Sequence, residues 1–168
     1  NTVGNYNVAS GGNSLSTNVA GSKATAIGYG AMQYAKNTNT AYDNRNIAVG
    51  FEALRGSTTP ASNIGIGNTA IGFQSLLSNA GGHENIAIGM ETLKNSVSGS
   101  FNTAVGNNSL LLNITGDWNT AIGFHTLYNN INGDFNVSIG NVSLLGNTSG
   151  QANTAVGNAT LRYNKTGN

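Results

Sequence analysis

Two aspartates that lie one repeat length apart in the chain, Asp117 and Asp134, are the residues best suited to chemistry in this sequence. If one turn of a regular fold separates them, their carboxylates lie about 5 Å apart, the separation found in retaining glycosidases. The residues at the corresponding places on either side are Ser100 and Gln151, and both aspartates follow a glycine. Solvated polar side chains at a turn are therefore the simpler interpretation of the pair.

An aromatic residue occupies the next place along the chain. Phe101, Trp118 and Phe135 recur at the same interval as the aspartates, so they are expected to stack in the same way. An exposed ladder would bind sugar rings, whereas a buried one would belong to the core of the molecule or to a contact between chains. We expect burial, because three exposed aromatic rings would form an adhesive patch. Trp118 with Asp117 and Asp134 remains the candidate carbohydrate contact.

Other chemistry finds little support in the sequence. Cysteine is absent, and His83 and His125 occupy different places in the repeat described below, so no metal site is expected. The segment 65–70 matches the G-x-G-x-x-[GA] dinucleotide signature, but that signature needs a helix directly after it, and no helical pattern follows. No Ser/His/Asp constellation can be assigned from spacing. We therefore expect no cofactor and no enzymatic activity.

The composition excludes further classes of partner. Only 8% of the 168 residues are charged and the net charge is +1, which argues against nucleic acid as a partner. No run approaches the roughly 18 apolar residues of a transmembrane helix, so no membrane insertion is expected in this segment. Instead the chain holds 24 glycines and 29 asparagines, a composition that requires either disorder or a special architecture.

A 17-residue repeat decides between these two possibilities. A typical unit is NTAVGNNSLLLNITGDW (102–118), and residues 68–168 follow this length regularly. Residues 1–67 are less regular, because the units that begin at Ala24 and Asn46 are each followed by a five-residue insert, at 41–45 and 63–67. We expect one continuous rod.

The repeat positions, numbered 1 to 17 from the asparagine, predict a β-solenoid. Position 5 is glycine in all nine units, position 9 is leucine except at Met32, and position 4 is isoleucine or valine except at Ser10. Two short strands per coil, at positions 2–6 and from position 8, should each point one large aliphatic side chain inward. Asparagines at position 1 should bond one another along the stack. A late N-x-x-G turn, as at Asn113–Gly116, should give its glycine a positive φ.

The core expected from this pattern is thin, and positions 3, 5 and 8 hold small residues, which indicates oligomerisation. The motif N-T-A-[IV]-G-x-x-[ST]-L resembles the short repeats of phage tail-fibre proteins and is similar to the A-I-G repeats in the heads of trimeric autotransporter adhesins. The resemblance implies a parallel β-roll or β-helix with three chains around one axis, located outside the cell on a virion or bacterial surface.

The expected function is a structural and adhesive segment of such a fibre, with a surface polysaccharide or receptor as its partner. A carbohydrate-binding or polysaccharide-cleaving β-solenoid is the alternative. An ice-binding surface is disfavoured, because position 2 mixes threonine with isoleucine and valine.

Overall fold

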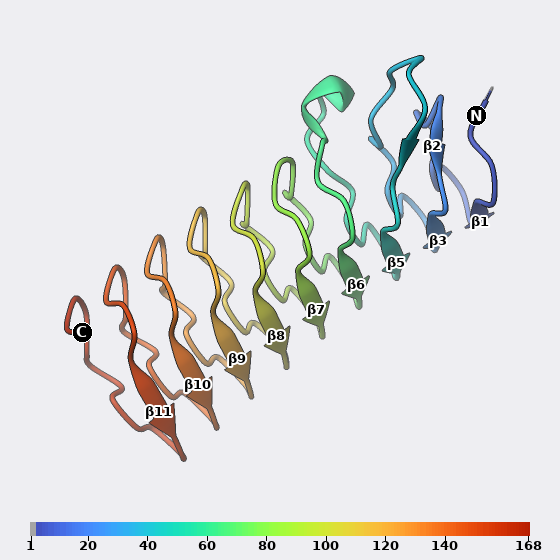
Figure 1. Cartoon of the computed structure of the whole chain (residues 1–168). Helices are drawn as coiled ribbons and strands as arrows, with labels where there is room; N and C mark the ends of the chain where they lie inside the picture. The colour runs from blue at the N-terminus through green and yellow to red at the C-terminus, as the bar shows by residue number, and fades with distance from the viewer. Residues whose placement is uncertain (1–2) are drawn as a thin grey trace.

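The repeats fold into a parallel β-solenoid, which a computed structural model describes over residues 3–168 (Figure 1). In this part of the chain, nine three-residue strands form one sheet in which the strand of each coil pairs with that of the next coil. In sheet order the strands are β1 (Val8–Ser10), β3 (Thr25–Ile27), β5 (Ile47–Val49), β6 (Thr69–Ile71), β7 (Ile86–Ile88), β8 (Thr103–Val105), β9 (Thr120–Ile122), β10 (Val137–Ile139) and β11 (Thr154–Val156). The predicted all-β solenoid, with one repeat unit to each coil, is confirmed.

Equivalent repeat positions stack directly upon one another. Ala104 of β8 pairs with Ala121 of β9, which is the same position in the next repeat unit. In the two coils that carry the inserts, more residues separate equivalent alanines of neighbouring strands. Ala26 nevertheless pairs with Ala48, and Ala48 pairs with Ala70. The register of the sheet is therefore the same through the regular and the longer coils.

The two longer coils carry their extra residues in the turn opposite the main sheet (Figure 1). The sequence pattern puts these residues at 41–45 and 63–67, at the end of each coil. The hydrogen bonds correct this placement. The amide of Gly67 donates to the carbonyl of Asn44 at 3.1 Å. In regular coils, the amide at position 17 donates in the same way to the carbonyl at position 16 of the preceding coil. The last residues of each assigned insert thus occupy regular positions, and the extra length lies earlier in the turn.

Short elements order these longer turns. β2 (Gly21–Ser22) pairs in parallel with β4 (Tyr42–Asp43), and a 3-10 helix, η1 (Pro60–Ser62), lies at the tip of the second long turn. Asn63 closes the second turn, because its Oδ1 accepts the amide of Ser57 at 2.9 Å and its Nδ2 donates to the Ser57 carbonyl at 2.8 Å.

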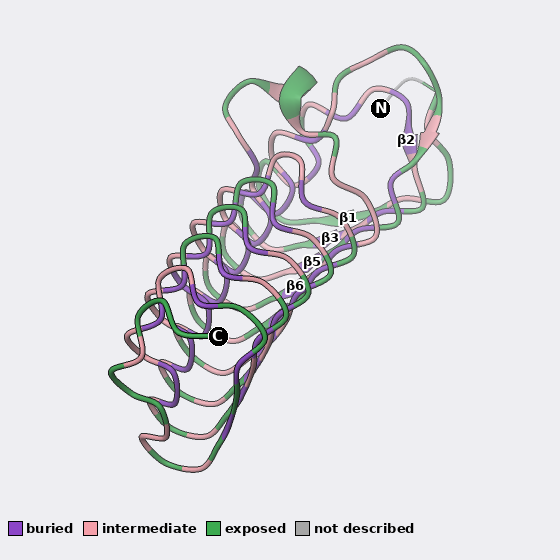
Figure 2. Ribbon diagram, turned by 60° about the vertical axis from the view of Figure 1, so that its left-hand side comes forward, coloured by how far each residue is buried: buried purple, intermediate pink, exposed green. Residues whose placement is uncertain are grey.

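The core is built from alanine and leucine, and the prediction of inward-facing isoleucine and valine at position 4 is wrong. Ala104 at position 3 and Leu110 at position 9 have no exposed surface, whereas Ile122 at position 4 is 40% exposed. Successive side chains of a strand point to opposite faces, so the inward alanine turns positions 2 and 4 outward. Figure 2 shows the buried residues recurring at the same places in successive coils.

The prediction of a second strand from position 8 is also wrong. Asn108 and Leu110 have φ values of 57° and 51°, in the left-handed region that strands do not contain. Coil-to-coil hydrogen bonds nevertheless continue there, because the Leu110 amide donates to the Thr126 carbonyl at 3.0 Å. A left-handed leucine costs about 1–2 kcal/mol, and the full burial of its side chain offsets this with about 1.5–3 kcal/mol.

Asparagines at position 1 form the predicted ladder. Asn119 donates twice to the Oδ1 of Asn102, through its backbone amide at 2.9 Å and through its side-chain Nδ2 at 3.1 Å. The same Nδ2 donates to the Gly133 carbonyl at 2.8 Å. Each asparagine of this kind therefore closes its own coil and ties it to the preceding one.

Glycine at position 15 serves close packing, and the predicted positive φ is found at position 5 instead. Gly106, at position 5, has a φ of 126°. Gly116, at position 15, does not have a positive φ. A Cβ placed on it would lie 2.5 Å from the carbonyl oxygen of Gly133 in the next coil. Only glycine therefore lets neighbouring coils approach this closely.

Candidate recognition surfaces

Asp117 and Asp134 lie in one column, as their spacing predicts, and both accept backbone amides. The Oδ1 of Asp134 accepts the amide of Asp117 at 2.8 Å, and the Oδ1 of Asp117 accepts that of Ser100 at 2.6 Å. A neutral side chain does the same one coil earlier, where the Oγ of Ser100 accepts the amide of His83 at 3.1 Å. Each aspartate thus has a structural role that a serine also fulfils.

Trp118 belongs to an aromatic ladder that is exposed on the single chain. Its ring centroid lies 4.1 Å from that of Phe101 and 6.4 Å from that of Phe135, with ring planes within 10° and 7° of parallel. The three residues are 39%, 51% and 58% exposed in chain order, so they do not belong to the core of the rod. The burial that we expected for this ladder is therefore not found on the single chain.

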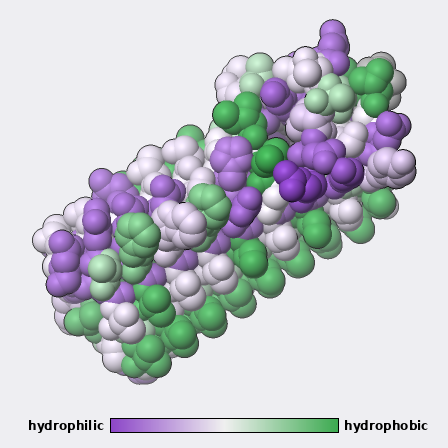
Figure 3. Space-filling view, in the orientation of Figure 1, coloured by the Kyte–Doolittle hydropathy of each residue, from purple (hydrophilic) through white to green (hydrophobic). Residues whose placement is uncertain are grey.

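A larger apolar surface runs along the main sheet. We call it the apolar sheet face and define it as the outward side chains at repeat positions 2, 4 and 6. Isoleucines such as Ile71, Ile88 and Ile122 are 38–40% exposed at position 4. Figure 3 shows apolar side chains in a row along the edge of the rod where the strands lie in Figure 1. No charged residue occurs at these three positions in any repeat unit.

Aromatic side chains stack within this face at position 6. The ring centroids of Tyr29 and Phe51 are 5.5 Å apart, and those of Phe51 and Phe73 are also 5.5 Å apart, with nearly parallel planes. Each of these rings is about half exposed. The sequence pattern indicates only a partly exposed edge at this position, and the structure shows a second aromatic ladder.

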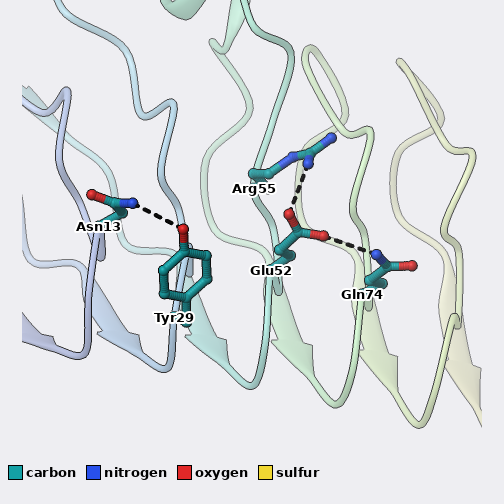
Figure 4. A network of polar contacts seen from close by, with 5 residues as sticks. All are labelled: Asn13, Tyr29, Glu52, Arg55 and Gln74. Carbon is teal, nitrogen blue, oxygen red and sulfur yellow. Dashed lines mark hydrogen bonds and ion pairs between the residues drawn. The ribbon is translucent and has the colours of Figure 1, made fainter.

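A band of polar side chains follows at position 7. The carboxylate of Glu52 accepts Nη1 of Arg55 through Oε1 and Nε2 of Gln74 through Oε2, both at 2.8 Å (Figure 4). In the earlier coils, Nδ2 of Asn13 donates to the hydroxyl of Tyr29 at 3.3 Å (Figure 4). Side chains in this band thus bridge consecutive coils on the rod surface.

The same band continues through Glu91. Lys94 lies 2.6 Å from its Oε1, and Asn108 donates to its Oε2 at 3.1 Å. The hydrogen bond from Lys94 is the main reason that the pKa of Glu91 is lowered from its ordinary value. Glu91 is thus held ionised in a partly solvated pair.

The second long turn borders an open pocket of about 500 Å³ between itself and the coils that follow. Hydroxyl side chains form much of the wall, and Val97 and Ala80 contribute apolar surface. Arg55 also lines the pocket, and its guanidinium is paired with Glu52. The lining contains no pair of titratable groups arranged for acid–base catalysis.

The remaining candidates from the sequence are dispersed. Nδ1 of His83 accepts the amide of Ile66 at 3.2 Å, and His125 stacks on Phe124 with centroids 3.8 Å apart. Within residues 3–168, no three His, Asp or Glu side chains converge on a place where a metal ion could bind. The G-x-G-x-x-[GA] match at 65–70 leads into strand β6 rather than into a helix. In the described chain no helix is long and apolar enough to span a membrane.

Sequence reasoning missed the apolar sheet face, although the signal for it is present. Position 3 is alanine in every unit except at Ser138, while position 2 varies among threonine, isoleucine and valine. An almost invariant small residue marks the tightly packed side of a strand, so its larger neighbours must face outward.

Comparisons with family models, with curated proteins and with solved structures find no match. The fold and the geometry of its surfaces therefore carry the functional argument.

Proposed function

We propose that this chain is a structural and adhesive segment of a trimeric extracellular fibre, of the kind found in phage tail fibres and bacterial surface adhesins. The observation that carries the proposal is the unbroken register of the main sheet from β1 to β11. At a strand spacing of about 4.8 Å, the described coils extend over roughly 40 Å. The repeat is then a spacer whose length is set by the number of coils.

The thin core supports association of several chains. Alanine and leucine fill the interior, so one coil buries little apolar surface, while large apolar side chains remain exposed outside. Three chains around a common axis would cover part of that surface. The resemblance of the N-T-A-[IV]-G motif to trimeric fibre repeats supports the same number of chains.

The proposed mechanism is mechanical and multivalent. A stiff rod holds a recognition surface away from its base, and three copies raise the avidity for a repetitive target without any new contact. A surface polysaccharide or receptor on a host cell is the proposed target. No catalytic step is proposed for this role.

Light scattering and small-angle X-ray scattering test the assembly. The expected mass is three times the 17.1 kDa of one chain, with the scattering profile of an elongated particle. A stable 17.1 kDa monomer contradicts the trimer, and the profile of a compact sphere contradicts the rod. Binding of labelled protein to bacterial cells and purified surface polysaccharides tests adhesion, and its absence reduces the role to a spacer.

A second candidate, carbohydrate binding or cleavage, is favoured by the exposure of the ladder around Trp118. In that case Trp118→Ala lowers the affinity for polysaccharide about 2- to 12-fold, since stacking on one aromatic ring is worth about 0.5–1.5 kcal/mol. Changing both Asp117 and Asp134 to asparagine, with full binding and cleavage retained, removes the aspartates from this hypothesis.

A further inference from the structure

We infer that the apolar sheet face is the surface through which copies of this chain associate side by side. The inference rests on the proposed fibre function and specifies which surface of the rod makes the assembly.

The size of the face supports an interface. In the described chain, 14 of the exposed large apolar residues belong to positions 2, 4 and 6, each between 38% and 64% exposed. At about half exposure, such side chains together present roughly 1,000 Å² of surface. The largest apolar patch of a typical monomer is about 300–600 Å², and a standard interface buries about 800 Å² on each partner. The face thus has the area that a stable association needs.

The charge pattern narrows the choice of partner. All 13 charged residues lie outside positions 2, 4 and 6. A partner rich in charge, such as a nucleic acid or an anionic membrane surface, would lose its solvation against this face without gaining an ion pair. An equally uncharged surface meets no such penalty, and this chain carries one.

The spacing of the side chains points to a second copy of the same chain. Directly stacked strands repeat the exposed side chains once per coil, so the face has ridges about 4.8 Å apart along the rod. Ridges of one rod fit between ridges of another over the whole length only if both have the same rise. A second copy meets this condition in every coil, whereas the sheet of a globular partner typically keeps this spacing over only about four to six strands.

One other apolar surface competes for the role, and it is shorter. Val97, Ile114 and Ile131 occupy position 13 in three consecutive coils and are 42–44% exposed. The ladder around Trp118 covers the same three coils. The sheet face continues from β1 to β11, so it offers contact along the full rod.

Matched double variants separate the two surfaces. The variant Ile88→Lys/Ile122→Lys puts two lysines on the sheet face, at side chains that are 38% and 40% exposed. The control Val97→Lys/Ile131→Lys puts them two coils apart on the competing surface, at side chains that are 44% and 42% exposed. Both variants add the same charge at the same spacing, and light scattering over a concentration series gives the mass of each.

The sheet-face variant is expected to be monomeric where the unmodified chain is assembled, with an apparent dissociation constant raised about 100-fold or more, because each copy would bury unpaired ammonium groups. The control is expected to stay assembled. A sheet-face variant that stays assembled, or a control that dissociates equally, overturns the inference while the fibre proposal stands. A monomeric unmodified chain contradicts both proposals.

Folding of the variants is checked independently. Both lysines of the sheet-face variant point into solvent on the separated chain, so the far-ultraviolet circular dichroism spectrum should match that of the control. The milder pair Ile88→Thr/Ile122→Thr uses a residue that is common at position 2 of the same strands. It is expected to weaken assembly by less than the lysine pair, and undiminished assembly of this variant counts against the inference.

Discussion

Ser96 and Asn79 occupy repeat position 12 in consecutive coils, and within residues 3–168 neither Oγ of Ser96 nor Oδ1 of Asn79 has a hydrogen-bond partner. Both residues are buried. At two steps where position 12 is asparagine in consecutive coils, the side chains bond: Nδ2 of Asn130 donates to Oδ1 of Asn113, and Nδ2 of Asn147 donates to Oδ1 of Asn130, both at 2.8 Å. The side chain of Ser96 carries no such amide, so it interrupts a second asparagine ladder inside the rod.

Replacing Ser96 with asparagine is expected to raise the free energy of unfolding by about 1–2 kcal/mol. The new amide would donate to Asn79, and its oxygen would accept from Asn113, as the position 12 ladder does elsewhere. Urea denaturation measures the change. Ser98→Asn, in the exposed turn of the same coil, is the control and should change stability by less than about 0.5 kcal/mol. A less stable Ser96→Asn variant would show that this coil is too narrow for the larger side chain.

Asn102→Asp should destabilise the rod by about 3 kcal/mol or more at neutral pH. The change removes the Nδ2 that donates to Asn85 Oδ1 at 3.1 Å and to the Gly116 carbonyl at 2.8 Å, and it buries a carboxylate beside both oxygens. The loss should shrink in acid, where the new carboxyl is neutral. Asn107→Asp is the control, because that exposed side chain only accepts the amide of Met90. Equal losses in both variants would refute a special role for the position 1 ladder.

Gly82 and Gly81 are adjacent but should respond differently to alanine. A Cβ on Gly82 would lie 3.0 Å from Nδ2 of Asn85 and still closer to the Gly99 carbonyl, whereas a Cβ on Gly81 would meet nothing nearer than Ser98 at 3.8 Å. Gly82→Ala is expected to cost about 1–3 kcal/mol. Gly81→Ala is expected to be neutral or to stabilise by up to about 1 kcal/mol. Thermal unfolding of both variants gives the comparison, and tolerance of Gly82→Ala would mean that the coils move apart readily.

Leu110→Ala and Ile122→Ala test the composition of the core. Leu110 has no exposed surface, so its truncation should cost about 2–5 kcal/mol. Ile122 is 40% exposed, and its truncation should cost about 1 kcal/mol or less in an Ile88→Lys background, at a concentration where light scattering gives the mass of one chain. Denaturant unfolding in that shared background measures both. A larger loss of unfolding free energy for Ile122→Ala would show that the side chain at position 4 packs inside the coil.

Lys94→Met should raise the pKa of Glu91 toward its ordinary value, because the hydrogen bond from Lys94 is the main cause of the lowering. Nuclear magnetic resonance titration of the Glu91 carboxyl measures the pKa, with Lys165→Met as the control. A lowered folded-state pKa contributes stability above the ordinary carboxyl pKa, and this contribution is lost as the pH falls through the lowered value. The effect on stability should be small, since the pair is partly solvated. An unchanged pKa of Glu91 in the Lys94→Met variant would show that the Lys94–Glu91 pair does not form.

The repeat made the stacking predictable, whereas the outline of each coil was harder to foresee. Identical residues at a fixed spacing can meet only if coils stack, and the ladder through Asn119 follows from that. The orientation of position 4 was ambiguous, because an interior of isoleucine and one of leucine both satisfy the hydrophobic pattern. The left-handed backbone of Leu110 was not predictable from propensity, since leucine rarely adopts it.

The placement of the candidate aspartates was predictable from the sequence, whereas their structural role was not. The regular spacing of the repeat brings Asp117 and Asp134 into one column, as expected. That their oxygens accept backbone amides was not evident, because serine and histidine side chains perform the same task in other coils. A position that accepts such different residue types carries no recognisable motif.

The longer coils keep the register of the sheet, with Ala26, Ala48 and Ala70 paired like the alanines of regular coils although more sequence separates them. Added sequence in the turn therefore alters the cross-section of one coil without altering the rise of the rod. The entropy of closing a loop grows slowly, by about 0.6 kcal/mol for each doubling of its length. The length of the rod and the shape of its surface can therefore change independently. The rod becomes longer when coils are added, and its surface changes when single turns are lengthened.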